Sequence, residues 1–333
     1  MKEDFNSSLY IYAYCFITDG KHRFSILDTT KNKLHFFDMC LYQIAKKEFR
    51  AKKVNEILEN LNDNDKEVVE DFVVYLIQNK LARFVDNIDN FPLLQKEWDT
   101  PYHIKYSIID VRDVWHNFDL IFSQLSELLC PEVELRVYRN FTLDEISQLL
   151  ETFQKHNFSA LYLLIPYDTS LFTQEGMTKL STIIKENYRL KLTVYGVPDT
   201  NLEELYSIKS KFTPLELNLR LSNKKINGKD DCGMINLNTL RSFDIAKVME
   251  IKQYNGCLNR MISIDENGFI KNCPSMNKNW GNIKNTTLVS VYNLKEFQKY
   301  WNICNDMVEI CSSCEYRCVC LGCRAYTANP DNL

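Results

Sequence analysis

The sequence has no hydrophobic run long enough to cross a membrane. Nowhere do about 18 apolar residues follow one another, and the first residues, with Lys2, Glu3 and Asp4, contain no apolar signal-peptide core. Neither a P-loop nor a GxGxxG motif is present, and no basic stripe is interleaved with aromatic residues. We therefore expect a cytoplasmic protein that has neither a membrane nor a nucleic acid as its partner.

Histidine is scarce, and all of it lies in the first half of the chain. The five histidines end at His156, whereas nine of the twelve cysteines lie between Cys232 and Cys323. A secreted disulfide-rich protein would need an export signal, so clustered thiolates for a metal are the better interpretation of these cysteines. A metal site in this part of the chain would therefore be built from cysteine.

Residues 1–98 combine short strand-like segments with amphipathic helices. The alternation of side chains, with turn signals between the segments, predicts strands at Leu9 to Thr18, Phe24 to Thr30 and Lys33 to Asp38. Apolar residues at helical spacing predict helices at Ala51 to Leu61 and Lys66 to Lys80. The order predicts a small α+β module that is winged-helix-like.

Residues 99–230 alternate between strand and helix. Strands are expected at His103 to Val111, Glu132 to Tyr138, Ala160 to Ile165, Leu190 to Val197 and Leu215 to Leu221. Helices are expected near Trp115 to Leu129, Thr142 to His156, Thr173 to Asn187 and Leu202 to Lys209. Consecutive βα units of this kind predict an α/β fold with a parallel sheet, either an open doubly wound sheet or a partial barrel.

In residues 231–333 the alternation of strand and helix patterns stops, and the sequence predicts a loop-rich region. Such a segment buries too little carbon to fold alone, so metal coordination would supply much of its stability. The run from Ile262 to Ile270 predicts a β-hairpin that turns at Gly268 and presents Cys273 after its second strand.

The cysteine spacing is the strongest signal in the sequence. Two CxxC turns, which can each bring two thiolates to one centre, lie at Cys311 to Cys314 and Cys320 to Cys323, and Cys257 and Cys273 precede them. The pattern predicts one or two metal sites. A four-cysteine zinc site is the alternative to iron and sulfur, because thiolates suit either metal.

These motifs resemble a SPASM domain, the auxiliary [4Fe-4S] module of radical SAM peptide-modifying enzymes. CLNRMISIDENGFIKNCPSM from Cys257, WGNI from Trp280 and CSSCEYRCVCLGCRAY from Cys311 are similar to the SPASM-domain peptide maturases of the grasp-with-spasm type. CFITDGKHRFSILDTT from Cys15 resembles the same family, so the likeness spans nearly the whole chain. Such proteins work with an ATP-grasp ligase and a ribosomally made precursor peptide.

The resemblance also implies a set of cluster ligands. One [4Fe-4S] cluster would be bound by Cys257, Cys273 and Cys323, and a second by Cys311, Cys314 and Cys320. Each set lacks a fourth protein ligand. Cys232 is the candidate for the first set, and Cys318 or Cys304 for the second.

The resemblance implies that residues 99–230 form a partial (βα) barrel like a radical SAM core, but the motif for radical chemistry is missing. The loop after the first predicted strand, Asp110 to Asn117, contains no cysteine in place of CxxxCxxC, and Arg139 to Thr142 lacks a glycine-rich acidic step. We therefore expect neither S-adenosylmethionine binding nor radical chemistry. Cys15, Cys40 and Cys130 are expected to be buried as small apolar side chains.

The N-terminal module resembles the leader-peptide recognition elements of such pathways. A leader peptide would add a strand to the edge of Lys33 to Asp38, with His35, Phe36 and Phe37 as contacts. The expected function is that of a maturation protein that binds a precursor peptide and assists an ATP-grasp ligase. Two alternatives stay open: a redox or electron-transfer protein that acts on the peptide through its clusters, and a zinc-stabilised scaffold.

Overall fold

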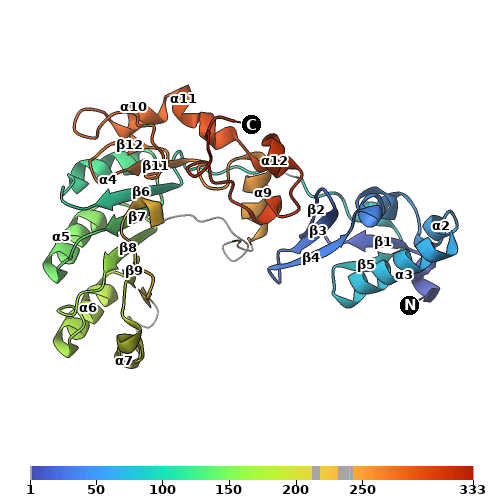
Figure 1. The fold of residues 1–333 in the computed structure, drawn as a ribbon, viewed down its shortest axis with the longest axis horizontal. Helices are drawn as coiled ribbons and strands as arrows, with labels where there is room; N and C mark the ends of the chain where they lie inside the picture. Colours follow the sequence, from blue (N-terminus) through green and yellow to red (C-terminus); the bar gives the residue numbers. More distant parts are fainter. Residues whose placement is uncertain (1, 96, 212–217, 232–239, 241–242, 333) are drawn as a thin grey trace.

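The computed structural model describes residues 2–95, 97–211, 218–231, 240 and 243–332. Its elements form an N-terminal module, an α/β domain built on a seven-stranded sheet, and a loop-rich C-terminal region (Figure 1). The C-terminal region lies between the other two parts and contacts both of them.

The N-terminal module contains two small antiparallel sheets and a bundle of short helices. One sheet has the order β2-β3-β4 and the other pairs β1 with β5, with bounds β1 Ser8–Ile11, β2 Cys15–Asp19, β3 Arg23–Asp28, β4 Lys33–Asp38 and β5 Ala82–Val85. The helices are α1 Phe49–Ala51, α2 Val54–Leu58 and α3 Asp63–Gln78, with a π-helical turn at Ile44–Glu48. Their apolar faces share a core with both sheets, around Phe24, Phe49 and Phe72.

The structure confirms the general pattern of this module and corrects two of its elements. The segment from Leu9 to Thr18 is not one strand, because the chain turns at residues 12–14 and its two halves, β1 and β2, belong to different sheets. The helix expected at Ala51 to Leu61 is shorter and is limited to α2. Strand β5 was not predicted at all.

The α/β domain follows the predicted alternation closely. Its strands are β6 Tyr106–Val111, β7 Glu132–Val137, β8 Ala160–Pro166, β9 Leu190–Tyr195 and β10 Leu219–Leu221, and the helices between them are α4 Phe118–Glu127, α5 Leu143–Gln154, α6 Gln174–Glu186 and α7 Asp199–Lys209. All five strands are parallel and neighbour each other in sequence order. The predicted strand at Leu215 to Leu221 begins on residues outside the described part of the chain, and β10 is its described end.

Helices α4, α5 and α6 cover one side of this sheet (Figure 1). Sequential parallel neighbours with right-handed crossovers place successive helices on the same face. The core between helices and sheet includes Phe122, Leu149, Leu163 and Leu180, all of which are buried.

The C-terminal region extends the same sheet instead of forming an isolated layer. Its helices are α9 Ile245–Gln253, α10 Leu288–Tyr292, α11 Lys295–Gln298 and α12 Glu309–Ser312, with a 3-10 turn η9 at Arg317–Val319. Strand β11 Met261–Ile264 pairs in parallel with β6, and β12 Ile270–Lys271 pairs antiparallel with β11. The predicted hairpin is therefore confirmed, and Gly268 adopts a φ of 85° at its turn.

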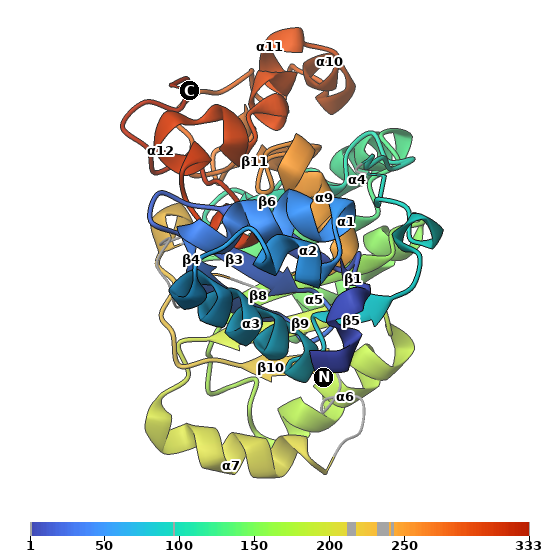
Figure 2. The ribbon, with the colours of Figure 1, turned by 90° about the vertical axis from the view of Figure 1, so that its right-hand side faces the viewer.

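The N-terminal sheet docks on the cysteine-rich loop through a small interdomain core. The buried residues of this core come from both sides, namely Phe16, Leu27, Val248, Met249, Cys318 and Val319. Figure 2 shows the module from its outer side, with the sheet turned toward α9. Among the described residues, every helix is too short or too polar to span a lipid bilayer.

Candidate functional site

The C-terminal cysteines lie on loops that pack against one another. Cys257 follows α9, Cys273 follows β12, and Cys304 is buried just before the 3-10 turn Asn305–Met307. Cys311 lies in α12, and Cys314, Cys318, Cys320 and Cys323 lie on the segment that follows it. The amide of Cys257 donates a hydrogen bond of 3.0 Å to the carbonyl of Leu321. This bond places Cys257 beside the second CxxC turn.

The side chain of Asn255 forms hydrogen bonds to these loops. Its side-chain amide donates to the carbonyls of Gly322 and Ile303, at 2.8 and 3.1 Å, and its oxygen accepts from the amides of Cys257 and Leu258. Asn255 is 2% exposed, so these bonds are shielded from water. One buried amide thereby joins the loop of Cys257 to the segments at Ile303 and Gly322.

Cys311, Cys314 and Cys320 interact electrostatically. The amide of Cys314 donates to the carbonyl of Cys311 at 3.0 Å, which closes the first CxxC turn. Burial raises the pKa of the Cys311 thiol, and the charges of Cys320 and Cys314 raise it further. Burial also raises the pKa of Cys320, with added effects of Cys314 and Cys323. Thiolates that repel one another in this way need a cation among them to be ionised together.

Cys273 lies at the other end of the same region. It is buried, and the hydroxyl of nearby Ser275 donates to the carbonyl of Lys229 at 2.7 Å. Tyr326, after the second CxxC turn, approaches both groups, because its hydroxyl lies 3.2 Å from the Ser275 oxygen and from the Lys229 carbonyl. The end of the chain thus runs from Cys320 and Cys323 toward the segment that follows Cys273.

Two of the predicted ligands need separate mention. Cys232 lies outside the described residues. Cys318 is described, and its side chain is 1% exposed within the interdomain core, away from solvent. Cys318 thus lies in the same small core as Phe16 and Met249.

The other cysteines were expected to be buried. Cys15 and Cys130 are buried, but Cys40 is exposed, because it lies in a 3-10 turn after the edge strand β4. The expectation for Cys40 was therefore wrong.

The fit of these residues to a metal depends on which metal centre is considered. Within the described part of the chain, no three His, Cys, Asp or Glu side chains are placed to share a single metal ion. In a [4Fe-4S] cluster each thiolate binds a different iron atom, so its ligands lie farther apart than those of one ion. The donor set itself, with several thiols on packed loops and no histidine, suits iron–sulfur chemistry.

The loops at the carboxyl ends of the first two parallel strands are held by polar contacts of their own. Arg112 forms a 2.6 Å ion pair with Glu266, and the ring of His116 lies 2.9 Å from the carbonyl of Asp110. In the next loop Arg139 pairs with Glu145, which also closes the capping box of α5.

The sheet also carries a buried polar group that the sequence analysis did not single out. Asp110 and Arg136 are register partners on β6 and β7, and the guanidinium donates two bonds of 2.6 and 3.0 Å to the carboxylate. Tyr138 donates to the same carboxylate at 3.2 Å. Burial alone would lower the pKa of Arg136, but the adjacent Asp110 charge outweighs this and raises it. Polar residues at alternate positions of predicted strands are the signal that could have identified this group.

The three residues predicted to contact a peptide have different environments. His35 is 4% exposed, and its Nδ1 lies 2.8 Å from the hydroxyl of Tyr75 on α3. Phe37 packs on Phe72 and Tyr75, whereas Phe36 lies under the guanidinium of Arg23. Strand β4 is the edge of its sheet in the described residues, and a groove of about 480 Å³ lies between it and α3.

The groove borders the cysteine-rich loop directly. Phe36 and Tyr316 have ring centroids 5.2 Å apart, and Arg23 forms a 2.8 Å ion pair with Glu315 and a 2.7 Å bond to the Tyr316 hydroxyl. On the other edge strand, Arg317 pairs with Asp19 at 2.7 Å. The residues between Cys314 and Cys320 therefore form the contact with the N-terminal sheet.

Comparison of the sequence with models of known protein families finds no match, and no curated protein sequence matches it either.

Proposed function

We propose that this protein is a cytoplasmic maturation protein for a ribosomally synthesised peptide. It binds the precursor peptide at the N-terminal module, carries one or two [4Fe-4S] clusters on its C-terminal cysteines, and assists a partner ATP-grasp ligase. The observation that carries the proposal is the contact of Glu315 and Tyr316 with the N-terminal sheet. This contact joins the cysteine-rich segment from Cys311 to Cys323 to the groove between β4 and α3.

The arrangement of thiols supports the cluster part of the proposal. Burial and the neighbouring cysteines raise the pKa of Cys311 and of Cys320, and Cys257 is bonded to the loop that holds Cys320 and Cys323. A cluster held there would supply a redox or structural centre, while the surrounding residues orient the thiolates and limit the access of water. A zinc ion on the same thiols is the alternative, because thiolates suit either metal.

The free edge of β4 supports the peptide part. An extended peptide could pair with this edge and place side chains into the groove against α3. Val68 and Tyr75 on α3 line the groove and are 45% and 38% exposed, although both are large. The buried His35 would act through Tyr75 and not through direct contact.

The α/β domain is, in this proposal, a partial barrel of radical SAM type without radical chemistry. Five parallel strands in sequential order, with helices on one side, are compatible with such a barrel. The loops that follow β6 and β7 are tied by Arg112–Glu266 and Arg139–Glu145 and contain no thiol.

The cluster is tested by anaerobic purification followed by an absorption spectrum and by assays of iron and sulfide. We expect iron and sulfide in similar amounts, and their loss in a Cys311→Ser/Cys314→Ser variant. The matched control is Cys40→Ser, which removes an exposed thiol outside the cysteine-rich region. If the anaerobically purified protein contained zinc and no iron, the cluster proposal would be wrong. The zinc-stabilised scaffold would then be the better interpretation.

The peptide groove is tested by capture of a candidate precursor peptide encoded beside the gene. A Val68→Glu change places a carboxylate in the groove and should lower the affinity at least tenfold. Asn64→Glu adds the same charge on α3 outside the groove and should leave it unchanged. Equal capture by both variants would show that the peptide does not use this groove.

A further inference from the structure

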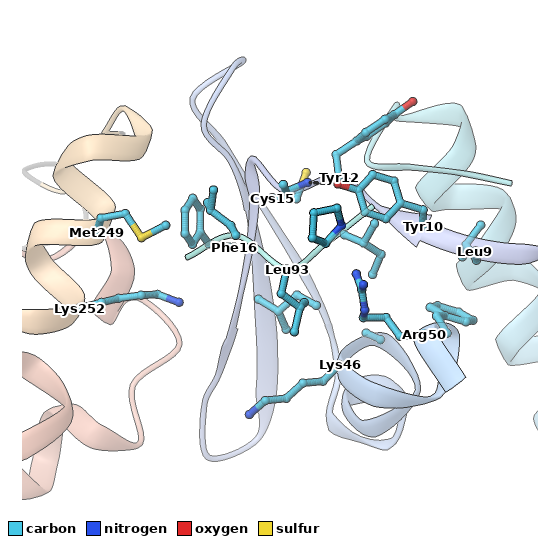
Figure 3. A pocket seen from close by; sticks show the side chains of 17 residues that line it. Leu9, Tyr10, Tyr12, Cys15, Phe16, Lys46, Arg50, Leu93, Met249 and Lys252 are labelled. Atoms are coloured by element: carbon cyan, nitrogen blue, oxygen red, sulfur yellow. Dashed lines mark hydrogen bonds between the residues drawn. The ribbon is translucent and has the colours of Figure 1, made fainter. Parts of the chain in front are cut away.

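A second groove lies on the opposite edge of the three-stranded sheet, where the N-terminal module faces α9. Its volume is about 340 Å³, and its walls come from β1, β2, the helical turn before α1, the segment after residue 91, and α9 (Figure 3). It shares no residue with the β4 groove. The two grooves are therefore separate sites.

The edges of two strands border this second groove. Residues Leu9 to Ala13 and Cys15 to Ile17 line it as consecutive residues. Side chains alternate between the two faces of a strand, so consecutive lining residues mean that the strand edge itself faces the cavity. In the described chain β1 pairs only with β5, and β2 only with β3. The amides of Ala13 and Cys15 and the carbonyl of Asp19 are bonded within the chain. Neither outer edge pairs with a further described strand, so an added strand could pair there.

The walls between these edges are apolar. Phe16 from β2 and Met249 from α9 lie side by side at one end of the groove, and Leu93 lies between this end and Tyr10 (Figure 3). Leu93 is 72% exposed and Leu94 37%, so two leucines at the rim are held in water. An incoming apolar side chain would remove these surfaces from solvent, which favours binding.

All charged side chains that line the groove are cationic. Lys46, Arg50 and Lys252 reach it from two different helical segments, and no Asp or Glu lines it (Figure 3). Lys46 donates to the Tyr42 hydroxyl and Arg50 to the carbonyl of Phe91, at 2.5 and 2.8 Å. Neither forms a salt bridge with any described residue. The charge of the site therefore complements carboxylates.

We propose that this groove binds an extended peptide segment in which acidic side chains flank an apolar one. The open strand edges supply main-chain hydrogen bonds, the apolar walls take the central side chain, and the three cations meet the flanking carboxylates. The strand edges distinguish this occupant from a small apolar acid, which offers no backbone to pair. The proposal stands independently of the peptide site at β4.

Isothermal titration with two synthetic peptides tests the proposal. Acetyl-ELELE-amide should bind the full-length protein at least tenfold more tightly than acetyl-KLKLK-amide. A Lys46→Glu variant should weaken binding of the acidic peptide at least tenfold, and Lys252→Glu, on a different helix, should do the same. Lys185→Glu, at the exposed end of α6, is the matched control and should change the affinity less than twofold.

Three results would overturn the proposal. Equal affinity for the two peptides would remove the role of charge. Binding of decanoate with the same sensitivity to Lys46→Glu, without binding of the acidic peptide, would identify a site for a small amphiphile. Concentration-dependent dimerisation that Lys46→Glu abolishes would identify a second copy of the chain as the occupant. Circular dichroism confirms that each variant is folded.

Discussion

Replacement of Arg136 should destabilise the α/β domain. Its side chain is 7% exposed and donates two bonds to Asp110, whose side chain is 2% exposed. Arg136→Leu would leave a buried carboxylate without its partner, and such losses cost about 3–5 kcal/mol. We expect the urea midpoint of unfolding to fall accordingly, with the slope unchanged.

Arg139→Leu is the control for this change. Arg139 also pairs with a carboxylate, that of Glu145, but both side chains are about a third exposed, at 32% and 28%. Partly hydrated pairs contribute about 0–1 kcal/mol, so this variant should unfold close to the wild type. Equal losses in the two variants would mean that burial of the Asp110–Arg136 pair is unimportant.

His35 should make stability depend on pH. Burial, followed by the charge of Lys33, lowers the pKa of its imidazole. Its Nε2 is buried without a hydrogen-bond partner in the described residues, so a second proton there would have no acceptor. The unfolded chain therefore binds the proton more readily than the folded one. The resulting stability is complete above about pH 6.5 and is lost as the pH falls through that value.

Urea unfolding at several pH values checks this expectation. Between about pH 7.5 and 5.5, His35→Asn should lose less stability than the wild type. His116 and His156 also have lowered pKa values, mainly through burial, so part of the slope remains in the variant. An unchanged slope in His35→Asn would contradict the role of this residue.

The β11–β12 hairpin depends on its turn. Gly268 has a φ of 85°, and a Cβ atom there would lie 3.2 Å from the Asn282 side chain. An L-residue in this conformation costs roughly 1–2 kcal/mol. Gly268→Ala should therefore lower the urea midpoint, whereas Gly228→Ala, where no positive φ is needed, should lower it less. The opposite order would show that the turn tolerates a side chain.

Local patterns in the sequence predicted most of the elements but not how distant ones pair. The βα units were predictable because each helix and strand has its own apolar period and cap, as in the Thr142 capping box of α5. The break between β1 and β2 was not, because Tyr12, Ala13 and Tyr14 carry no turn residue. The pairing of β11 with β6 joins residues about 150 positions apart, which no local pattern encodes.

In the candidate site, too, local features were predictable from the sequence and tertiary contacts were not. Spacing identified the CxxC turns, because two thiols three positions apart share a turn whatever the fold. It could not show that Cys318 lies in the small core with Phe16 and Met249, because this core joins elements that are far apart in the sequence. The contact of Glu315 with Arg23 likewise depends on tertiary structure.

At the scale of the whole molecule, Arg317 joins the two ends of the chain. Its guanidinium pairs with Asp19 on β2 and with Asp306, and its side chain is 14% exposed. Arg317→Ala should loosen the docking of the N-terminal sheet. We expect faster hydrogen–deuterium exchange in β2 and β3 and unchanged exchange in β7 and β8, which serve as the internal control. Unchanged exchange in all four strands would mean that the interdomain core alone holds the sheet in place.

The segment that grips the N-terminal sheet is short, and both of its ends are cysteines proposed to bind iron. In a chain without its cluster, Glu315, Tyr316 and Arg317 would be held less firmly. The groove between β4 and α3 would then be misaligned with the rest of the protein. Protein molecules that lack the cluster would therefore bind the precursor peptide weakly. Comparing peptide capture by iron-depleted and iron-replete preparations measures this; equal capture would rule this dependence out.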